Sequence, residues 1–149
     1  MTQDDDLPPA TSLALILSAL GPKNMEANEG FSERLLQMAR DIKFRETIGE
    51  EPDLVIHKVR LPAIGEIEIP QGSRVVSAAE QNGSIFIWYM FPVQAAELPK
   101  QIVPVALIGT GQKVDHDFHV AMDFYQSVHM KNGEVWHIFF GHSKYADDK

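Results

Sequence analysis

One run of large apolar side chains, Ser84–Phe91, constrains the fold more than any other stretch of the chain. In it, seven consecutive apolar or aromatic residues follow Ser84, which itself follows the dipeptide Asn82-Gly83. The run is too short to span a membrane, and its composition is typical of a strand buried on both faces. Asn-Gly supplies the two residues with positive φ that a type I′ hairpin turn requires. The sequence therefore predicts a hairpin whose second strand lies in the middle of a sheet.

Strand-like segments follow one another from residue 54 onward, separated by turn residues such as Pro70-Gln71-Gly72. Pro104 interrupts one of them, which predicts an edge position or a bulge. Short strands at this spacing favour an antiparallel β-sandwich or small barrel of six to seven strands. The segments are Leu54–Leu61, Ile64–Ile69, Arg74–Gln81, Ser84–Phe91, Gln101–Ile108, Asp123–Met130 and Glu134–Phe140.

Two Asn-Gly dipeptides allow strand register to be predicted, because a two-residue loop pairs the residues that flank it. The first hairpin should pair Gln81 with Ser84, Ala79 with Phe86, Ser77 with Trp88 and Val75 with Met90. The second, around Asn132-Gly133, should pair Lys131 with Glu134, His129 with Trp136 and Val128 with His137. In that register His137 is predicted to be a neutral, hydrogen-bonded core histidine.

The N-terminal third predicts a helical hairpin. Leu13–Leu20 has apolar residues on one helical face and ends at Gly21-Pro22. A second helix is predicted within Asn24–Thr47, with Ser32 as its N-cap. The fold class is thus α+β but mainly β, with residues 1–49 as an acidic tail and helical extension, 50–142 as the β domain and 143–149 as a polar tail.

Composition narrows the classes of partner. The 149 residues carry a formal net charge of −8 and include no cysteine. The acidic balance argues against nucleic acid, which is bound through Lys and Arg, and the missing cysteines exclude thiol chemistry. The apolar run near the N-terminus follows Asp4-Asp5-Asp6 rather than basic residues, so a secretory signal is not predicted. We expect a cytoplasmic protein with no membrane partner.

A series of motifs in residues 56–140 resembles an uncharacterised family of small β domains found in bacteriophage and prophage proteins. The motifs, in order, are Val59-Arg60-Leu61-Pro62, Ile69–Val75, Gln81-Asn82-Gly83 before a Trp-bearing strand, Gly109-Thr110-Gly111, and Trp136–Phe139. Gln112-Lys113-Val114 departs from the family pattern, which resembles His-Pro-Ile at this place. The resemblance implies a phage-encoded accessory protein, located in the host cytoplasm, and supplies no catalytic residue.

Two segments carry residue types that are used in binding sites. His116 and His119, among Asp115, Asp117 and Asp123, could ligate a divalent metal, but the spacing is not a zinc signature, and we favour a polar loop. Gly109, Thr110, Gly111 and Lys113 could form a ligand loop. Because the Lys-Ser/Thr ending of a phosphate-binding loop is missing, we favour a structural turn there as well.

The sequence carries no catalytic motif, so we predict a non-enzymatic protein with no catalytic residue and no cofactor. The preferred function is protein binding, either to a host factor or to itself as a dimer or higher homo-oligomer. The residues expected to bind the partner are the apolar stripe of the second helix, Phe31, Leu35, Met38 and Ile42. A small-molecule or nucleotide-binding module using residues 109–123 is the alternative, and a metal-dependent hydrolase is the least favoured.

Overall fold

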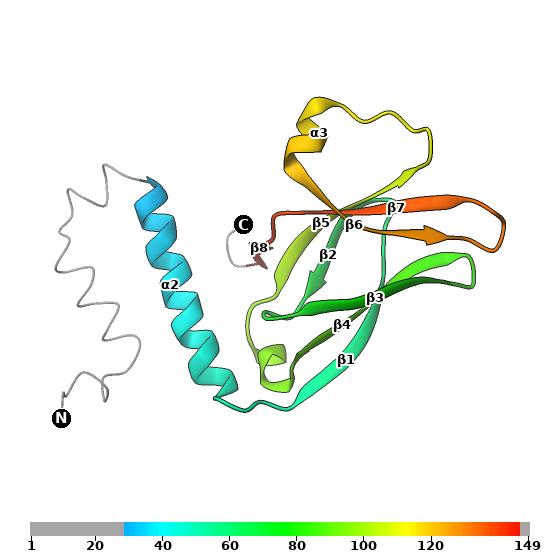
Figure 1. The fold of residues 1–149 in the computed structure, drawn as a ribbon. Coiled ribbons are helices and arrows are strands. Elements are labelled where there is room, and N and C mark those ends of the chain that lie inside the picture. Colours follow the sequence, from blue (N-terminus) through cyan, green and yellow to red (C-terminus); the bar gives the residue numbers. More distant parts are fainter. Residues whose placement is uncertain (1–28, 147–149) are drawn as a thin grey trace, which may run out of the picture. The chain divides into compact units, whose positions relative to one another are not determined.

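The computed structural model describes residues 29–146, which belong to two compact units, one up to Glu51 and one from Pro52 (Figure 1). In the first unit, helix α2 (Glu29–Ile48) confirms the second predicted helix. It starts before Ser32, so the prediction of Ser32 as N-cap is wrong. Gly49, at φ 76°, ends the helix by donating its N–H to the carbonyl of Arg45. The helix predicted over Leu13–Leu20 lies outside the described residues.

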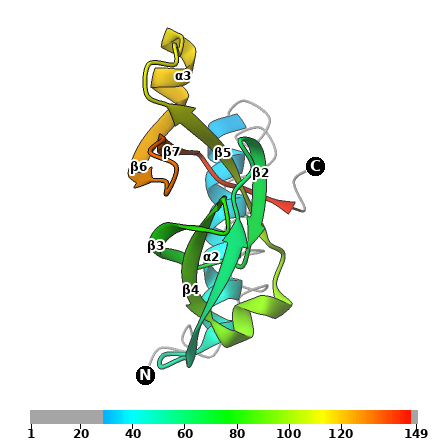
Figure 2. The same ribbon diagram turned by 90° about the vertical axis from the view of Figure 1, so that its right-hand side faces the viewer.

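In the second unit, residues 52–146 contain eight strands in two antiparallel sheets (Figures 1 and 2). Sheet A has three strands in the order β1-β4-β3, and sheet B has the order β2-β5-β7-β6, with β8 also pairing with β5. The strands are β1 (Leu54–Arg60), β2 (Ile64–Ile69), β3 (Arg74–Gln81), β4 (Ser84–Pro92), β5 (Gln101–Gly109), β6 (Met122–His129), β7 (Val135–Gly141) and β8 (Lys144–Tyr145). A 3₁₀ helix, η2 (Val93–Glu97), and a short helix, α3 (His116–Ala121), lie in the connections.

This arrangement confirms a mainly β, sandwich-like fold, with one strand more than the upper end of the expected range. The added strand is β8, which lies in the segment predicted to be a polar tail. No helix in the described part of the chain is long and apolar enough to cross a membrane.

The core lies between the two sheets. Ile87 of β4 and Ile138 of β7 have no exposed area, and Val105 of β5 is also fully buried. These side chains belong to one continuous apolar cluster that receives residues from both sheets. Burial also raises the pKa of the Tyr89 hydroxyl above its ordinary value of 10.0, because the phenolate loses hydration.

The central position of β4 in sheet A is as predicted, but its burial on both faces is not. Ile85, Ile87, Tyr89 and Phe91 point inward and are buried, whereas the alternate residues are only half-buried. Side chains of a strand alternate between its two faces, and the inward set of this strand belongs to the core cluster. The two faces of the strand therefore differ in burial although both are apolar. The outward residues Phe86, Trp88 and Met90 are therefore left at the surface.

The segment Leu61–Ala63 carries the chain from sheet A to sheet B. The N–H of Leu61 donates to Ile85 of β4 at 2.9 Å, and the carbonyl of Ala63 accepts from the N–H of Leu107 of β5 at 2.7 Å. On the opposite side, the Gln126 side chain of β6 donates to the carbonyl of Ala78 in β3 at 3.1 Å. The edges of the two sheets are therefore connected on both sides of the core.

The first hairpin confirms its predicted turn and most of its register. Asn82 and Gly83 have φ of 53° and 83°, and Gln81, Ala79 and Ser77 pair as predicted. The pairing of Val75 with Met90 is wrong, because a β-bulge at Val76 shifts the ladder and Val75 pairs with Tyr89 instead.

The second hairpin does not have the predicted register. Gly133 has φ 91°, but Asn132 is not in the left-handed region, so the turn is not type I′. The N–H of Gly133 donates to Met130 at 3.0 Å, and Met130 donates to Glu134 at 2.8 Å, which gives a three-residue loop. Val128 consequently pairs with Trp136, and His129 with Val135. A shift of one residue exchanges the faces of a strand, so His137 pairs with Ser127 and faces away from the core.

Pro104 lies on a central strand, not at an edge or a bulge as predicted. Successive residues of a strand direct their N–H groups to opposite sides. In β5, the N–H of Leu107 points toward the β2 side, where it donates to Ala63. Pro104 is three residues away, so the place of its missing N–H faces the other side, that of β7 and β8. There the ladder with β7 begins at Val105 and the ladder with β8 ends at Ile102. Proline is tolerated because it coincides with the gap between two partner strands.

Candidate functional site

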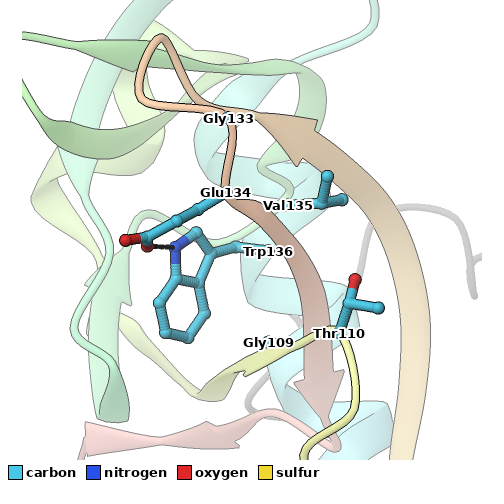
Figure 3. Close-up of a pocket in the computed structure, with 6 residues that line it drawn as sticks. All are labelled: Gly109, Thr110, Gly133, Glu134, Val135 and Trp136. Carbon is cyan, nitrogen blue, oxygen red and sulfur yellow. Dashed lines mark hydrogen bonds between the residues drawn. The ribbon is translucent and has the colours of Figure 1, made fainter.

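An open depression of about 470 Å³ lies where β5 ends and β7 begins (Figure 3). Its lining residues come from the end of β5, which supplies Gly109 and Thr110, and from the second hairpin. The hairpin supplies Gly133, Glu134, Val135 and Trp136. Because Gly109 pairs with Trp136 across the sheet, the two sides of the depression are held in register by the β5–β7 ladder.

The indole of Trp136 forms the largest wall of this depression. Its Nε1 donates a hydrogen bond to the Glu134 carboxylate at 3.0 Å, which fixes the orientation of the ring (Figure 3). Gly109 lies against the ring, and a Cβ added there would come within 3.5 Å of the indole. The ring is half-buried and packs on the edge of the core, so the surface it offers to a ligand is apolar.

Two hydroxyl groups bond the imidazole of His137 beside the depression. Thr110 Oγ1 lies 2.9 Å from Nε2, and Ser127 Oγ lies 2.7 Å from Nδ1. A neutral imidazole has one donor and one acceptor, so one hydroxyl donates to the ring and the other accepts. A hydroxyl supplies no negative charge to stabilise an imidazolium, whereas the carboxylate of a catalytic triad does. The two hydrogen bonds therefore hold Thr110, Ser127 and His137 together.

The predicted ligand loop is a tight turn, and only part of it reaches the depression. Gly109 and Thr110 line it, whereas Gly111 and Lys113 are not among the lining residues. The N–H of Thr110 donates to Val135, that of Gln112 to Gly109, and that of Gly109 to the Gln112 side chain. These N–H groups are engaged within the protein, so they do not form the open cradle of amides that binds a phosphate.

His116 and His119 lie on helix α3, where a polar loop was predicted. Asp115 caps this helix, its carboxylate accepting the N–H of Phe118 at 2.8 Å. The two imidazole centroids are 6.4 Å apart, and within residues 29–146 no three His, Cys, Asp or Glu side chains are grouped so that they could hold a metal ion. The sequence signal for this helix was Asp115, a residue type that is favoured at the N-cap. The helix is held on β7 by Phe118, whose ring centroid lies 5.2 Å from that of Phe139.

The predicted partner-binding stripe of α2 differs in exposure from one residue to the next. Leu35 is only 5% exposed, so its side chain is already covered, while Met38 is 44% exposed. Phe31 and Ile42 are half-buried. Leu36, which lies outside the predicted stripe, is 54% exposed.

A second surface, which the sequence reasoning missed, is the outward face of sheet A. Phe86, Trp88 and Met90 of β4 form a half-buried row along its centre. On the edge strand β1, Leu54 and Ile56 are 53% and 51% exposed. The Ser84–Phe91 run is apolar throughout and gave no signal, because it was assigned to a strand covered on both sides. The signal lay in the neighbouring strands, where Lys58, Arg60 and Arg74 pair with the outward residues of β4.

Residues 53–148 match the domain of unknown function DUF7352. The chain belongs to this family. The DUF7352 domain covers all eight strands, and α2 precedes it. The expected resemblance is therefore confirmed as far as a domain of unknown function is concerned. The comparisons with curated proteins and with solved structures found no significant match.

Both candidate surfaces belong to the DUF7352 domain. They lie on different sheets, so they can be tested by separate substitutions.

Proposed function

We propose that this chain is a non-enzymatic accessory protein of phage type that acts in the cytoplasm by binding another protein. The observation that supports binding is the outward face of sheet A, where the row of Phe86, Trp88 and Met90 is bordered by two half-exposed aliphatic side chains of β1. Contiguous apolar surface of this kind is a common feature of protein interaction sites. The phage origin rests on the order of motifs in residues 56–140.

The surroundings of His137 and of the two histidines of α3 favour a non-enzymatic role. The imidazole of His137 is held between two hydroxyls, and the histidines of α3 have no third ligand among the described residues. The first arrangement lacks the carboxylate that orients the histidine of a catalytic triad, and the second lacks the ligands that hold a catalytic metal.

Affinity capture from cells of the natural source tests the binding function. We expect the wild-type protein to retain a partner in stoichiometric amount, and the double variant Leu54→Ser/Ile56→Ser to lose it. The matched control is Ile64→Ser/Val120→Ser, which removes side chains that are 76% and 68% exposed elsewhere in the same unit. Equal capture by all three proteins, with circular dichroism showing each to be folded, would contradict a binding role for this face.

Self-association is the alternative form of protein binding and has its own measurement. Sedimentation velocity at several concentrations distinguishes a monomer from a dimer or higher oligomer. If the partner is a second copy, the wild-type protein and the control should both sediment as the larger species, and Leu54→Ser/Ile56→Ser should not.

The depression at Trp136 supports a second candidate, binding of a small apolar or aromatic molecule. An indole held by Glu134 and facing the backbone of Gly109 offers a flat apolar wall (Figure 3). A thermal-shift screen with nucleotides and aromatic metabolites is the test, because a ligand of the native state raises the melting temperature. A compound that stabilises wild-type protein but not Trp136→Leu would support this candidate, and a flat response would argue against it.

A further inference from the structure

We propose that the outward face of sheet A binds an acidic polypeptide segment that also carries apolar side chains. This inference rests on the proposed binding function and names the chemistry of the partner. It is derived from the cross-strand register of the outward row Phe86, Trp88 and Met90, called the aromatic row below. The register places one cation beside each end of this row and one beside its middle.

The register defines the neighbours of each outward residue of β4. Phe86 pairs with Arg60 of β1, Trp88 pairs with Lys58 of β1, and Met90 pairs with Arg74 of β3. Cross-strand partners lie on the same face, so the three cations border the aromatic row. All three are exposed. The remaining residues at outward register positions of the three strands are Leu54, Ile56, Ser77, Ala79, Gln81, Ser84 and Pro92, and none of them is acidic.

The position of Lys58 shows how a cation and the row are combined. Its Nζ lies 5.0 Å from the centroid of the Phe86 ring and is hydrogen-bonded to the Gln81 side chain of β3. The ammonium group is thus held over an aromatic ring while its outer side remains in solvent. A carboxylate placed above this face would meet Lys58 and an apolar group at the same time.

The charge of this face is opposite to that of the chain. The whole protein has a net charge of −8, and the outward positions of β2 in sheet B include Glu66 and Glu68. No outward residue of sheet A is acidic, and the acids nearest to its edge are Glu66 and Glu68, which line a depression beside Arg60. Lys58 and Arg74, which do not line that depression, therefore give the middle and the Met90 end of the face a local positive charge. Complementary charge steers association and selects partners, so the expected partner is acidic.

Charge also argues against two other occupants. A second copy that docked by the same face would bring three cations against three cations, which is repulsive in a two-fold interface. Nucleic acid binding normally requires more cations than three, and the acidic remainder of the chain would repel the phosphate backbone. An acidic segment with apolar side chains satisfies both the cations and the exposed Ile56.

The experiment measures binding of labelled 12-residue peptides by fluorescence anisotropy. The probes are an alternating Glu-Leu peptide, an alternating Lys-Leu peptide, a Glu-Ser peptide and a 12-nucleotide thymidine single strand. The full chain is used throughout. We expect the Glu-Leu peptide to bind most tightly and its affinity to fall as NaCl is raised from about 50 to 500 mM, because salt screens charge pairs at a surface.

Matched charge reversals assign the binding to this face. The test variant is Lys58→Glu/Arg60→Glu/Arg74→Glu, and the control is Lys100→Glu/Lys113→Glu/Lys131→Glu, which changes the net charge by the same amount at exposed positions outside sheet A. Reversal of three rim charges should weaken the Glu-Leu peptide by about 30-fold or more, on the basis of about 3-fold or more per site, and the control by less than about 3-fold.

The outcomes separate this inference from the binding function itself. Equal losses in both variants, equal affinity of the Lys-Leu peptide, or no binding of the Glu-Leu peptide would overturn the acidic partner. Tighter binding of the thymidine strand would overturn it in favour of nucleic acid. In each of these cases a partner lost by Leu54→Ser/Ile56→Ser would still support binding by the face, whereas capture that is unaffected by that variant contradicts the function and not only the chemistry of the partner.

Discussion

The two isoleucines Ile138 and Ile64 allow the core to be tested with one chemical change in one sheet. Ile138 on β7 has no exposed area and belongs to the core cluster, whereas Ile64 on β2 is 76% exposed. Substitution of either residue by alanine removes three carbon atoms and a β-branch. The same atoms are removed in both variants, and strand propensity, which differs between the edge strand β2 and the inner strand β7, spans only about 1 kcal/mol. A larger difference between the two variants therefore reports burial.

The expected cost at Ile138 follows from its burial. Three buried carbons at about 0.8 kcal/mol each give a transfer contribution of about 2.4 kcal/mol. The cavity left by the side chain adds to this, and Ile→Ala substitutions in cores cost about 2 to 5 kcal/mol, so we expect about 3 to 4 kcal/mol for Ile138→Ala. For Ile64→Ala the change in the free energy of unfolding should be below about 1 kcal/mol, because its surface is already largely hydrated.

Urea unfolding followed by circular dichroism and tryptophan fluorescence measures both values. The midpoint should fall strongly for Ile138→Ala, with an unchanged slope if unfolding remains two-state. A difference of less than about 1 kcal/mol between the two variants would refute the assignment of Ile138 to the centre of the core.

Three further predictions concern a tyrosine, a glycine and a helix cap. Burial raises the pKa of Tyr89 in the folded state, so the tyrosine of the unfolded state ionises first as the pH rises. The free energy of unfolding should therefore fall above about pH 10, and urea unfolding at alkaline pH should show a smaller fall for Tyr89→Phe. Gly133→Ala should reduce the free energy of unfolding by about 1 to 2 kcal/mol in urea, since φ is 91° and the added Cβ meets no atom within 4 Å, so the cost comes from the backbone alone; no change would mean that the loop relaxes. Asp115→Ala should remove about 1 kcal/mol from α3 and increase hydrogen exchange in residues 116–121, while exchange in the strands stays unchanged.

Local turn chemistry explains which parts of the fold could be predicted. Asn82 and Gly83 both take positive φ, so the first turn and the nearby register were correct. The same dipeptide at Asn132-Gly133 is part of a three-residue loop, which a single sequence does not distinguish from the two-residue form. That difference of one residue moved His137 from the predicted core face to the outward face, where it bonds Thr110 and Ser127.

Tertiary arrangement explains the remaining differences. The bulge at Val76 and the gap opposite Pro104 depend on which strands become neighbours, and that information is not contained in the strand segments themselves. The site residues also divide into those predictable from one segment and those brought together by strand pairing. Gly109 and Thr110 were selected from their own segment, but Trp136 and Glu134 join them only through the β5–β7 ladder.

The passage of the chain at Leu61–Ala63 has a consequence for folding. Hairpins β3–β4 and β6–β7 are formed by neighbouring segments and can close in about 1 to 10 μs. Sheet A, however, needs β1 and sheet B needs β2, and these two strands are consecutive and joined by three residues. Docking of one places the other, so the two sheets should be completed together. We therefore expect the β unit to fold and unfold as one cooperative system, without a stable state in which only one sheet is formed.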